Sequence, residues 1–127
     1  MTPTKKVLVV EDDADIRDMI RDMLISQGIS VLTANDGVEA LETFHQHRPT
    51  LVMADIRMPN KDGIQMAEAI KEIDRKTPII LFSGQYPDLL WDKMDNKLKC
   101  DHVLFKPLQK SDVLESVQLF LHDNFAL

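Results

Sequence analysis

Short apolar runs recur along the chain and alternate with longer amphipathic stretches. Five runs are rich in branched or aromatic side chains and have the length of single strands, at residues 6–10, 29–34, 50–54, 78–82 and 102–105. None alternates strictly between apolar and polar positions, which is typical of strands that are buried on both faces. We therefore expect a parallel sheet covered by helices on both sides.

The stretches around these runs have helical spacing. Apolar residues three and four positions apart define four helix faces, and these are Ile16/Met19/Ile20/Met23/Leu24, Val38/Leu41/Phe44, Met66/Ala67/Ile70/Ile73 and Val113/Leu114/Val117/Leu121. Asp13 precedes the first of these helices, and Asp36 with Glu39 has the spacing of a capping box for the second. Gly28 is expected to close the first helix.

A further helix is predicted between the fourth and fifth strands. Pro87 suits its first turn, and an apolar arc follows that consists of Leu90, Trp91, Met94 and Leu98. Leu89 points roughly the opposite way, so its side chain is expected to be exposed and available to a partner. The complete pattern is a five-stranded parallel α/β fold in one domain, residues 1–127.

Composition narrows the class of protein. The chain has 127 residues, of which 44% are hydrophobic, enough for one core without a stabilising disulfide or metal. Cys100 is the only cysteine, and no apolar run approaches the length of a membrane span, so we expect a cytoplasmic protein without membrane contact. The formal charge of -6 argues against nucleic-acid binding by this domain.

Polar residues directly follow four of the predicted strands. Glu11 and Asp12 follow the first strand, Asp55 the third, Ser83 the fourth and Lys106 the fifth. The carboxyl ends of parallel strands meet at one edge of a sheet, where ligands of such folds bind. Carboxylates gathered there repel one another unless a cation joins them, and a set of oxygen ligands favours Mg²⁺. A lysine and a hydroxyl beside that cation suit the handling of a phosphoryl group.

The segments "VVEDD", "MADIRMP", "LFSG" and "FKP" occur in this order across nearly the whole chain. In this order and at these spacings they resemble the receiver domain of bacterial two-component response regulators, the CheY-like family. The resemblance implies a five-stranded sheet in the order 2-1-3-4-5, flanked by five helices. It also implies that Asp55 accepts the phosphoryl group and that Glu11, Asp12, Asp55 and the Arg57 main-chain carbonyl hold Mg²⁺.

The same resemblance assigns the remaining residues at this edge of the sheet. It makes Ser83 the switch hydroxyl and Lys106 the site lysine, and it places a cis peptide bond before Pro107. Asp13 has no role in the family pattern and is expected to cap a helix. The donor would be a sensor histidine kinase or a histidine phosphotransfer protein, and the product would change a surface recognised by a downstream effector protein or domain. The chain would catalyse only its own phosphorylation and dephosphorylation and would not otherwise be an enzyme.

One position departs from the family. Three residues before Lys106, where most receivers carry Tyr or Phe, this chain has Val103. A valine has no ring to rotate, so we expect activation to be transmitted through the loop after Ser83 and the fourth helix, with Tyr86 and Trp91 as the responding aromatics. His102 is one residue out of register and is expected on the other face of the strand.

Two other function classes would also place an aspartate at the end of a buried strand. A receiver-shaped interaction module that no longer cycles phosphate would usually lack an acid or the lysine, and this chain has all of them. A haloacid-dehalogenase-type phosphatase expects Asp-x-Asp, but the residue two positions after Asp55 is Arg57. The phosphoacceptor is therefore favoured, with the interaction module as the alternative.

Overall fold

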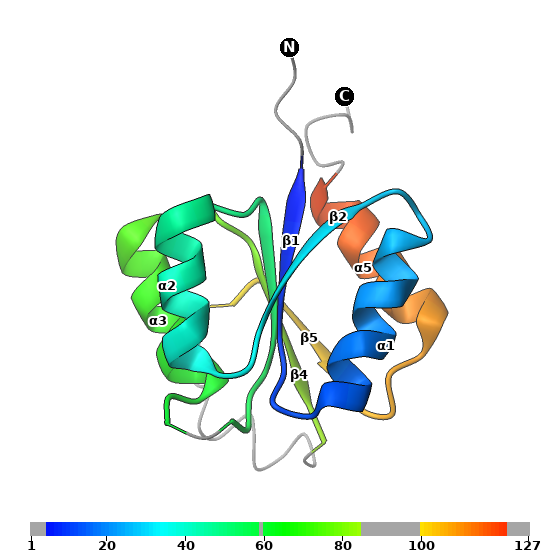
Figure 1. The fold of residues 1–127 in the computed structure, drawn as a ribbon, viewed down its shortest axis with the longest axis horizontal. Helices are drawn as coiled ribbons and strands as arrows, with labels where there is room; N and C mark the ends of the chain where they lie inside the picture. The colour runs from blue at the N-terminus through cyan, green and yellow to red at the C-terminus, as the bar shows by residue number, and fades with distance from the viewer. Residues whose placement is uncertain (1–4, 59, 85–99, 122–127) are drawn as a thin grey trace.

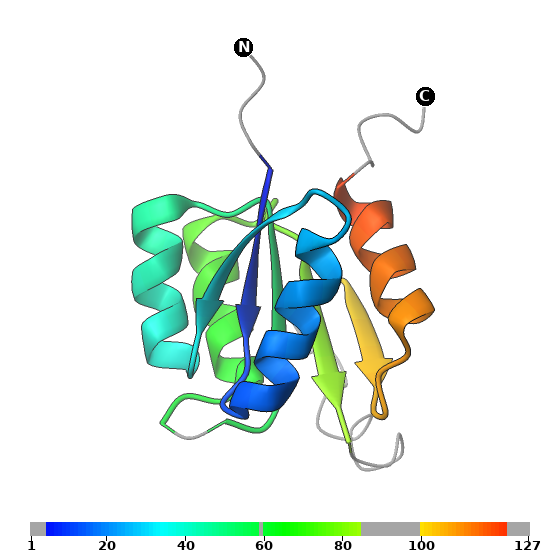
Figure 2. The same cartoon turned by 45° about the vertical axis from the view of Figure 1, so that its right-hand side comes forward.

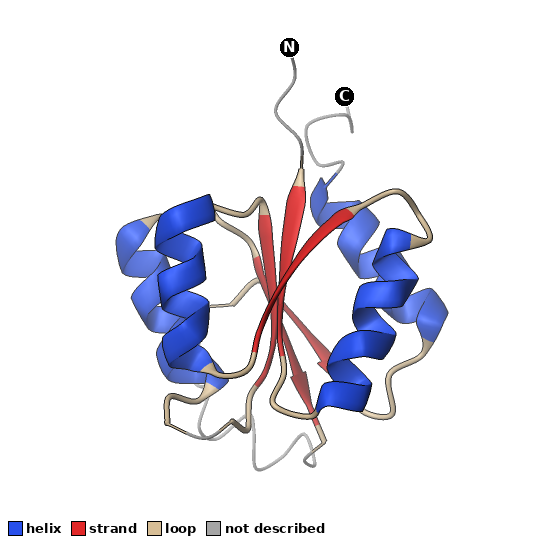
Figure 3. Ribbon diagram, in the orientation of Figure 1, coloured by secondary structure: helices blue, strands red, loops and turns tan. Residues whose placement is uncertain are grey.

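The fold has three layers, a central sheet between two pairs of helices (Figures 1 and 3). The structure is a computed structural model that describes residues 5–58, 60–84 and 100–121. Helices α2 (Gly37–His47) and α3 (Gly63–Ile73) cover one face of the sheet, and α1 (Ala14–Ile25) and α5 (Lys110–Leu121) cover the other (Figure 1). No described helix is both long enough and apolar enough to cross a membrane.

The sheet has the predicted topology. Its strands are β1 (Lys6–Val10), β2 (Ser30–Ala34), β3 (Leu51–Asp55), β4 (Ile79–Ser83) and β5 (His102–Phe105), each within a residue of the segment expected from the sequence. All neighbouring pairs are parallel, and the order is β2-β1-β3-β4-β5. Asp55 and Ser83 are the last residues of their strands, whereas the sequence analysis placed them just beyond the strand ends.

The predicted caps of α1 and α2 are confirmed, but the capping box expected for Asp36 and Glu39 is only half formed, because the Glu39 carboxylate accepts a hydrogen bond from the N–H of Asn35 instead. Asp13 caps α1 by accepting hydrogen bonds from the backbone N–H groups of Asp15 and Ile16, and Asp36 caps α2 through the N–H of Glu39. Gly28 lies just beyond α1 with a φ of 78°, a conformation in which glycine has no side-chain penalty. The predicted fourth helix, with Leu89, Tyr86 and Trp91, lies outside the described residues.

Two apolar clusters lie on opposite faces of the sheet. Alternate residues of β1 divide between them, with Leu8 and Val10 facing α2 and α3 and with Val7 and Val9 facing α1 and α5. Phe44 of α2 is fully buried in the first cluster. This double burial explains why the strands are apolar at almost every position.

The predicted burial of two helix residues is wrong. Val38 is 45% exposed and Met19 is 41% exposed, although both were assigned to buried helix faces. On α2, Gly37, Ala40 and Phe44 form the buried line instead. Gly37 packs against the backbone of Lys61, so the first residue of α2 belongs to its buried face and the next, Val38, lies outside it.

All five strands run in the same direction, so their carboxyl ends lie at one edge of the molecule (Figure 2). We call this edge the rim. It carries Glu11, Asp12, Asp55, Ser83 and Lys106, which are the residues that the sequence analysis expected to meet.

Candidate functional site

Three carboxylates meet at the rim. Glu11 and Asp12 follow β1, Asp55 ends β3, and the pairing of Val10 with Ala54 sets these strand ends side by side. One carboxylate oxygen from each acid lies within 4.8 Å of the others. A close, all-oxygen donor set without His or Cys fits a hard divalent cation, and Mg²⁺ is the cation that such a set commonly holds in proteins.

The three acids differ in their access to water. Glu11 is 1% exposed and Asp55 is 5% exposed, whereas Asp12 is exposed. The buried pair has fixed positions in the packed sheet edge. Asp12 forms the open side, through which a hydrated ion can approach.

Lys106 adds a positive charge that contacts two of the three acids. Its Nζ donates a hydrogen bond to Oδ2 of Asp55 and lies 3.4 Å from Oε1 of Glu11. The peptide bond from Lys106 to Pro107 is cis, as predicted, and the Lys106 N–H donates a 2.8 Å hydrogen bond to the carbonyl of Ser83. Burial disfavours the charged lysine, but the hydrogen bond and charge of Asp55, together with Glu11, raise its pKa above the ordinary value.

The second oxygen of Asp55 is also engaged. Its Oδ1 accepts a 3.0 Å hydrogen bond from the backbone N–H of Arg57. Asp55 therefore has one oxygen directed to the start of the β3–α3 loop and the other to Lys106. The role of the Arg57 carbonyl as a metal ligand stays a prediction.

Ser83 lies at the same edge, at the end of β4. It is 2% exposed and pairs with Phe105 of β5 in the sheet register. The next residue, Gly84, approaches the Lys106 side chain, because a Cβ there would lie 3.7 Å from the Cδ atom. The hydroxyl and the lysine thus belong to one packed corner of the rim.

Glu11 has an unusual protonation equilibrium. Burial, a hydrogen bond with Asp12 and the charge of Asp55 raise its pKa from 4.5 to about 7, against the opposing effect of Lys106. Without a cation, the carboxyl is thus partly protonated near neutral pH. A bound cation would stabilise the charged form of the buried Glu11 carboxylate.

This equilibrium predicts a pH-dependent stability in the absence of metal. Because the folded pKa is raised, the contribution of Glu11 is fully present below about pH 4.5 and is lost as the pH rises through about 7. Glu11→Gln should therefore gain free energy of unfolding relative to the wild type across this window. Urea unfolding in a chelating buffer, with the exposed Glu68→Gln as control, measures the difference. A difference that does not change with pH would contradict the raised pKa.

The sequence analysis missed the contacts that fix the β3–α3 loop. A Cβ on Gly63 would lie 2.9 Å from Cα of Ile56 and closer still to the Asp55 carbonyl. The first residue of α3 therefore packs directly against the backbone of Asp55, the phosphoacceptor candidate. Asn60 donates a hydrogen bond to Asp36 at the start of α2. Asn60 and Gly63 were visible in the sequence only as turn residues, because their partners lie on other elements.

The structure agrees with the predicted register around Val103. Val103 is half-buried and packs against the cluster beneath α2 and α3, whereas His102 is exposed and its ring lies 6.5 Å from that of Phe120 on α5. His102 therefore lies on the other face of β5 and cannot replace the missing aromatic.

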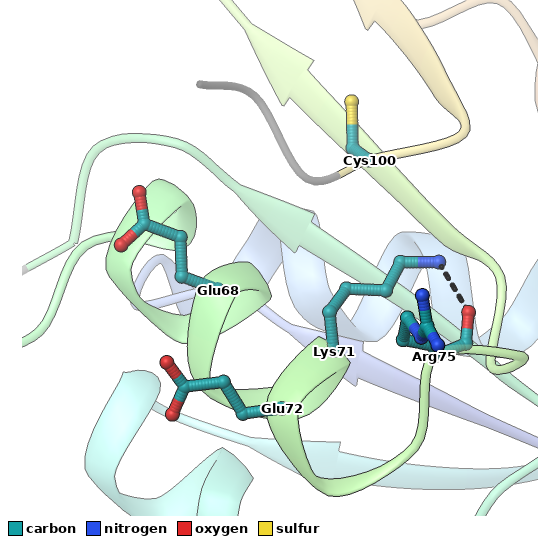
Figure 4. A pocket seen from close by; sticks show the side chains of 5 residues that line it. All are labelled: Glu68, Lys71, Glu72, Arg75 and Cys100. Carbon is teal, nitrogen blue, oxygen red and sulfur yellow. Dashed lines mark hydrogen bonds between the residues drawn. The ribbon is translucent and has the colours of Figure 1, made fainter. Parts of the chain in front are cut away.

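A separate hollow lies away from the rim, between the second half of α3 and Cys100, which lies two residues before β5 (Figure 4). It is lined by Glu68, Lys71, Glu72, Arg75 and Cys100. Burial, and then the charge of Asp101, raise the pKa of the Cys100 thiol to about 11. The thiol is therefore protonated at neutral pH and is a poor nucleophile.

The family model described as Response regulator receiver domain matches residues 7–118. The chain is 35% identical to the chemotaxis protein CheY of Bacillus subtilis, over 92% of this chain and 98% of that protein. It is also 35% identical to the transcription factor SKN7 of Candida albicans, over 95% of this chain but 22% of that protein.

Solved structures show the same likeness. The chemotaxis protein CheY4 of Vibrio cholerae superposes with a TM-score of 0.82 at 27% identity, over 91% of this chain and 98% of that one. The N-terminal domain of an uncharacterised protein from Wolinella succinogenes superposes with a TM-score of 0.86 at 30% identity, over 97% and 98% of the two chains.

Proposed function

We propose, from the premise that this chain belongs to the response regulator receiver domain family, that Asp55 accepts a phosphoryl group in a reaction that requires Mg²⁺. One observation supports the proposal above the others. The carboxylate of Asp55 lies close to two further acids and contacts the Lys106 ammonium, so a candidate cation site and a positive charge adjoin the same nucleophile. That arrangement suits charge stabilisation in phosphoryl transfer.

The acids have distinct tasks in this proposal. Glu11, Asp12 and Asp55 would hold the ion, whose charge, when bound, offsets the repulsion between the Asp55 carboxylate and the phosphoryl oxygens. The buried positions of Glu11 and Asp55 fix the direction in which the nucleophilic oxygen points. The exposed Asp12 leaves that side open to the donor.

In the transfer step a carboxylate oxygen of Asp55 forms a bond to phosphorus as the phosphorus–nitrogen bond of a phosphohistidine breaks. The bonding electron pair leaves with the imidazole nitrogen, and the product is an acyl phosphate on Asp55. In the structure, the Lys106 ammonium contacts Asp55 directly. After the transfer, we propose that it moves to the new phosphoryl oxygens. The added charge then draws in the Ser83 hydroxyl.

The donor in this scheme is a sensor histidine kinase or a histidine phosphotransfer protein, and the product is recognised by a downstream effector protein or domain. Catalysis is limited to the chain's own phosphorylation and dephosphorylation. Since Cys100 is the only cysteine, a reducing compartment is in keeping with the sequence, and the cytoplasm is our proposed location.

Signal transmission in this scheme does not depend on a rotating ring at Val103. A half-buried valine reports movement of Ser83 only through a small change in packing. The residues expected to respond, from Gly84 to Met94, lie almost wholly outside the described part of the chain.

The proposal is tested by binding of beryllofluoride, which mimics an acyl phosphate on aspartate. Fluorine-19 NMR should show a bound resonance when Mg²⁺ is present and none when it is chelated. A receiver-shaped interaction module that does not cycle phosphate would show no bound resonance in either condition. That outcome would replace the proposed function with the alternative.

A further inference from the structure

The Arg57 backbone lies in the loop that connects β3 to α3. This loop spans residues 56–62, and its Arg57 N–H contacts Oδ1 of Asp55 at 3.0 Å. The loop is closed at its base by a 2.9 Å hydrogen bond from Gly63 N–H to the carbonyl of Ile56. Arg57 therefore belongs to a short loop whose two ends are held together.

Helix α2 holds the middle of this loop. The Asn60 side-chain amide donates a 2.9 Å hydrogen bond to Oδ2 of Asp36, while Oδ1 of the same carboxylate accepts the Glu39 N–H at 2.8 Å. One side chain thus caps α2 and holds the loop. The Glu39 N–H, followed by the Asn60 amide, lowers the pKa of Asp36, so both hydrogen bonds are made to a charged group at neutral pH.

Steric contact supports the same junction. A Cβ on Gly37 would lie 2.9 Å from Cβ of Lys61 and closer to the Lys61 carbonyl, so α2 and the loop touch without space for a side chain. Asn60 has a φ of 69°, in the left-handed region that asparagine tolerates better than most residues. Asn60 and Lys61 therefore lie close against the first residues of α2.

We infer that Asn60 is a positioning residue, whose hydrogen bond to Asp36 holds the β3–α3 loop against α2 and thereby sets the Mg²⁺ affinity of the rim. This inference rests on the proposed function, because the Arg57 carbonyl is a metal ligand only in that scheme. Asn60 lies three positions beyond Arg57 and acts through the loop backbone. The start of α2 thereby becomes part of the metal site's support.

The test is Mg²⁺ affinity measured by isothermal titration calorimetry on the whole chain. Asn60→Gly removes the amide and keeps the left-handed conformation accessible, and it should weaken Mg²⁺ binding about fivefold, the scale of one hydrogen bond to a charged group. Asn60→Asp sets two carboxylates face to face and should weaken it further. Asn35→Gly, a matched change at an exposed residue of the neighbouring β2–α2 loop, should leave the affinity unchanged.

A swap separates the hydrogen bond from the residue itself. Asp36→Asn combined with Asn60→Asp keeps a competent α2 cap and restores an amide–carboxylate bond with donor and acceptor exchanged, so affinity should return to within about twofold of the wild type. Thermal unfolding without metal tests whether each variant is folded.

Three outcomes would overturn the inference. Unchanged affinity in both Asn60→Gly and Asn60→Asp would show that the loop needs no anchor on α2. Failure of the swap to recover affinity would show that the loss does not come from this hydrogen bond. Absence of Mg²⁺ binding by the wild type would overturn the proposed function and this inference together, whereas wild-type binding with insensitive variants would overturn only the inference.

Discussion

The Asp55→Asn variant is expected to lose at least about a hundredfold in its rate of phosphorylation by a small phosphodonor such as phosphoramidate. Asparagine keeps the size of the side chain but offers a neutral amide, which is a poor nucleophile. It also removes the negative charge that Lys106 contacts. Intact mass spectrometry of the reaction over time measures the rate.

Asp13→Asn is the matched control for this variant. Asp13 lies at the same rim, but its carboxylate caps α1, and asparagine caps helices about as well as aspartate. Phosphorylation of the control should follow the wild type. Equal labelling of the Asp55→Asn variant, with the same lability to hydrolysis, would show that the acceptor is another residue.

The Asp12→Ala variant should lose metal binding and phosphoryl transfer together. Removing one of three converging carboxylates should weaken Mg²⁺ binding by at least about tenfold, because the remaining pair carries less negative charge toward the ion. Calorimetry gives the affinity, and phosphoramidate kinetics at a Mg²⁺ concentration near the wild-type Kd give the transfer rate.

The same variant should not be less stable than the wild type without metal. Asp12 is exposed, so its removal relieves repulsion with Asp55, and this gain offsets the loss of the hydrogen bond that Asp12 shares with Glu11. A large loss of unfolding free energy in chelating buffer would mean that Asp12 has a structural role. Unchanged Mg²⁺ affinity would exclude it from the metal site.

The strands and the rim could be predicted from the sequence because the residues that define them are neighbours along the chain. Each buried strand is a short apolar run, and the polar site residues lie at its end, as Asp55 does at the last position of β3. The parallel arrangement then brings these ends together without any knowledge of side-chain contacts. The topology itself came from the resemblance to a family and was confirmed by the strand order.

The difference between Glu11 and Asp12 could not be predicted. The two acids are adjacent and chemically similar in sequence, yet one is buried and the other exposed. Burial depends on how β1 ends against β3 and on the approach of Lys106 from a residue far along the chain. The raised pKa of Glu11 is therefore a tertiary property.

The contact between α2 and the β3–α3 loop was missed for the same reason. Asp36 was predicted correctly as a helix cap, but its second oxygen binds Asn60, a residue 24 positions away. The error at Val38 has the same origin, because the loop covers Gly37 and leaves the next side chain exposed. Helical periodicity describes one face of a helix and carries no information about a loop that packs on its first turn.

The most direct test of the central claim is the intact mass of the chain after incubation with phosphoramidate, with Mg²⁺ and with a chelator. The account predicts that one phosphoryl group is added when Mg²⁺ is present, that none is added when it is chelated, and that Asp55→Asn remains unmodified in both conditions. Addition that proceeds equally without Mg²⁺, or equally in Asp55→Asn, would contradict the claim that Asp55 and its acidic neighbours form a Mg²⁺-dependent phosphoacceptor site.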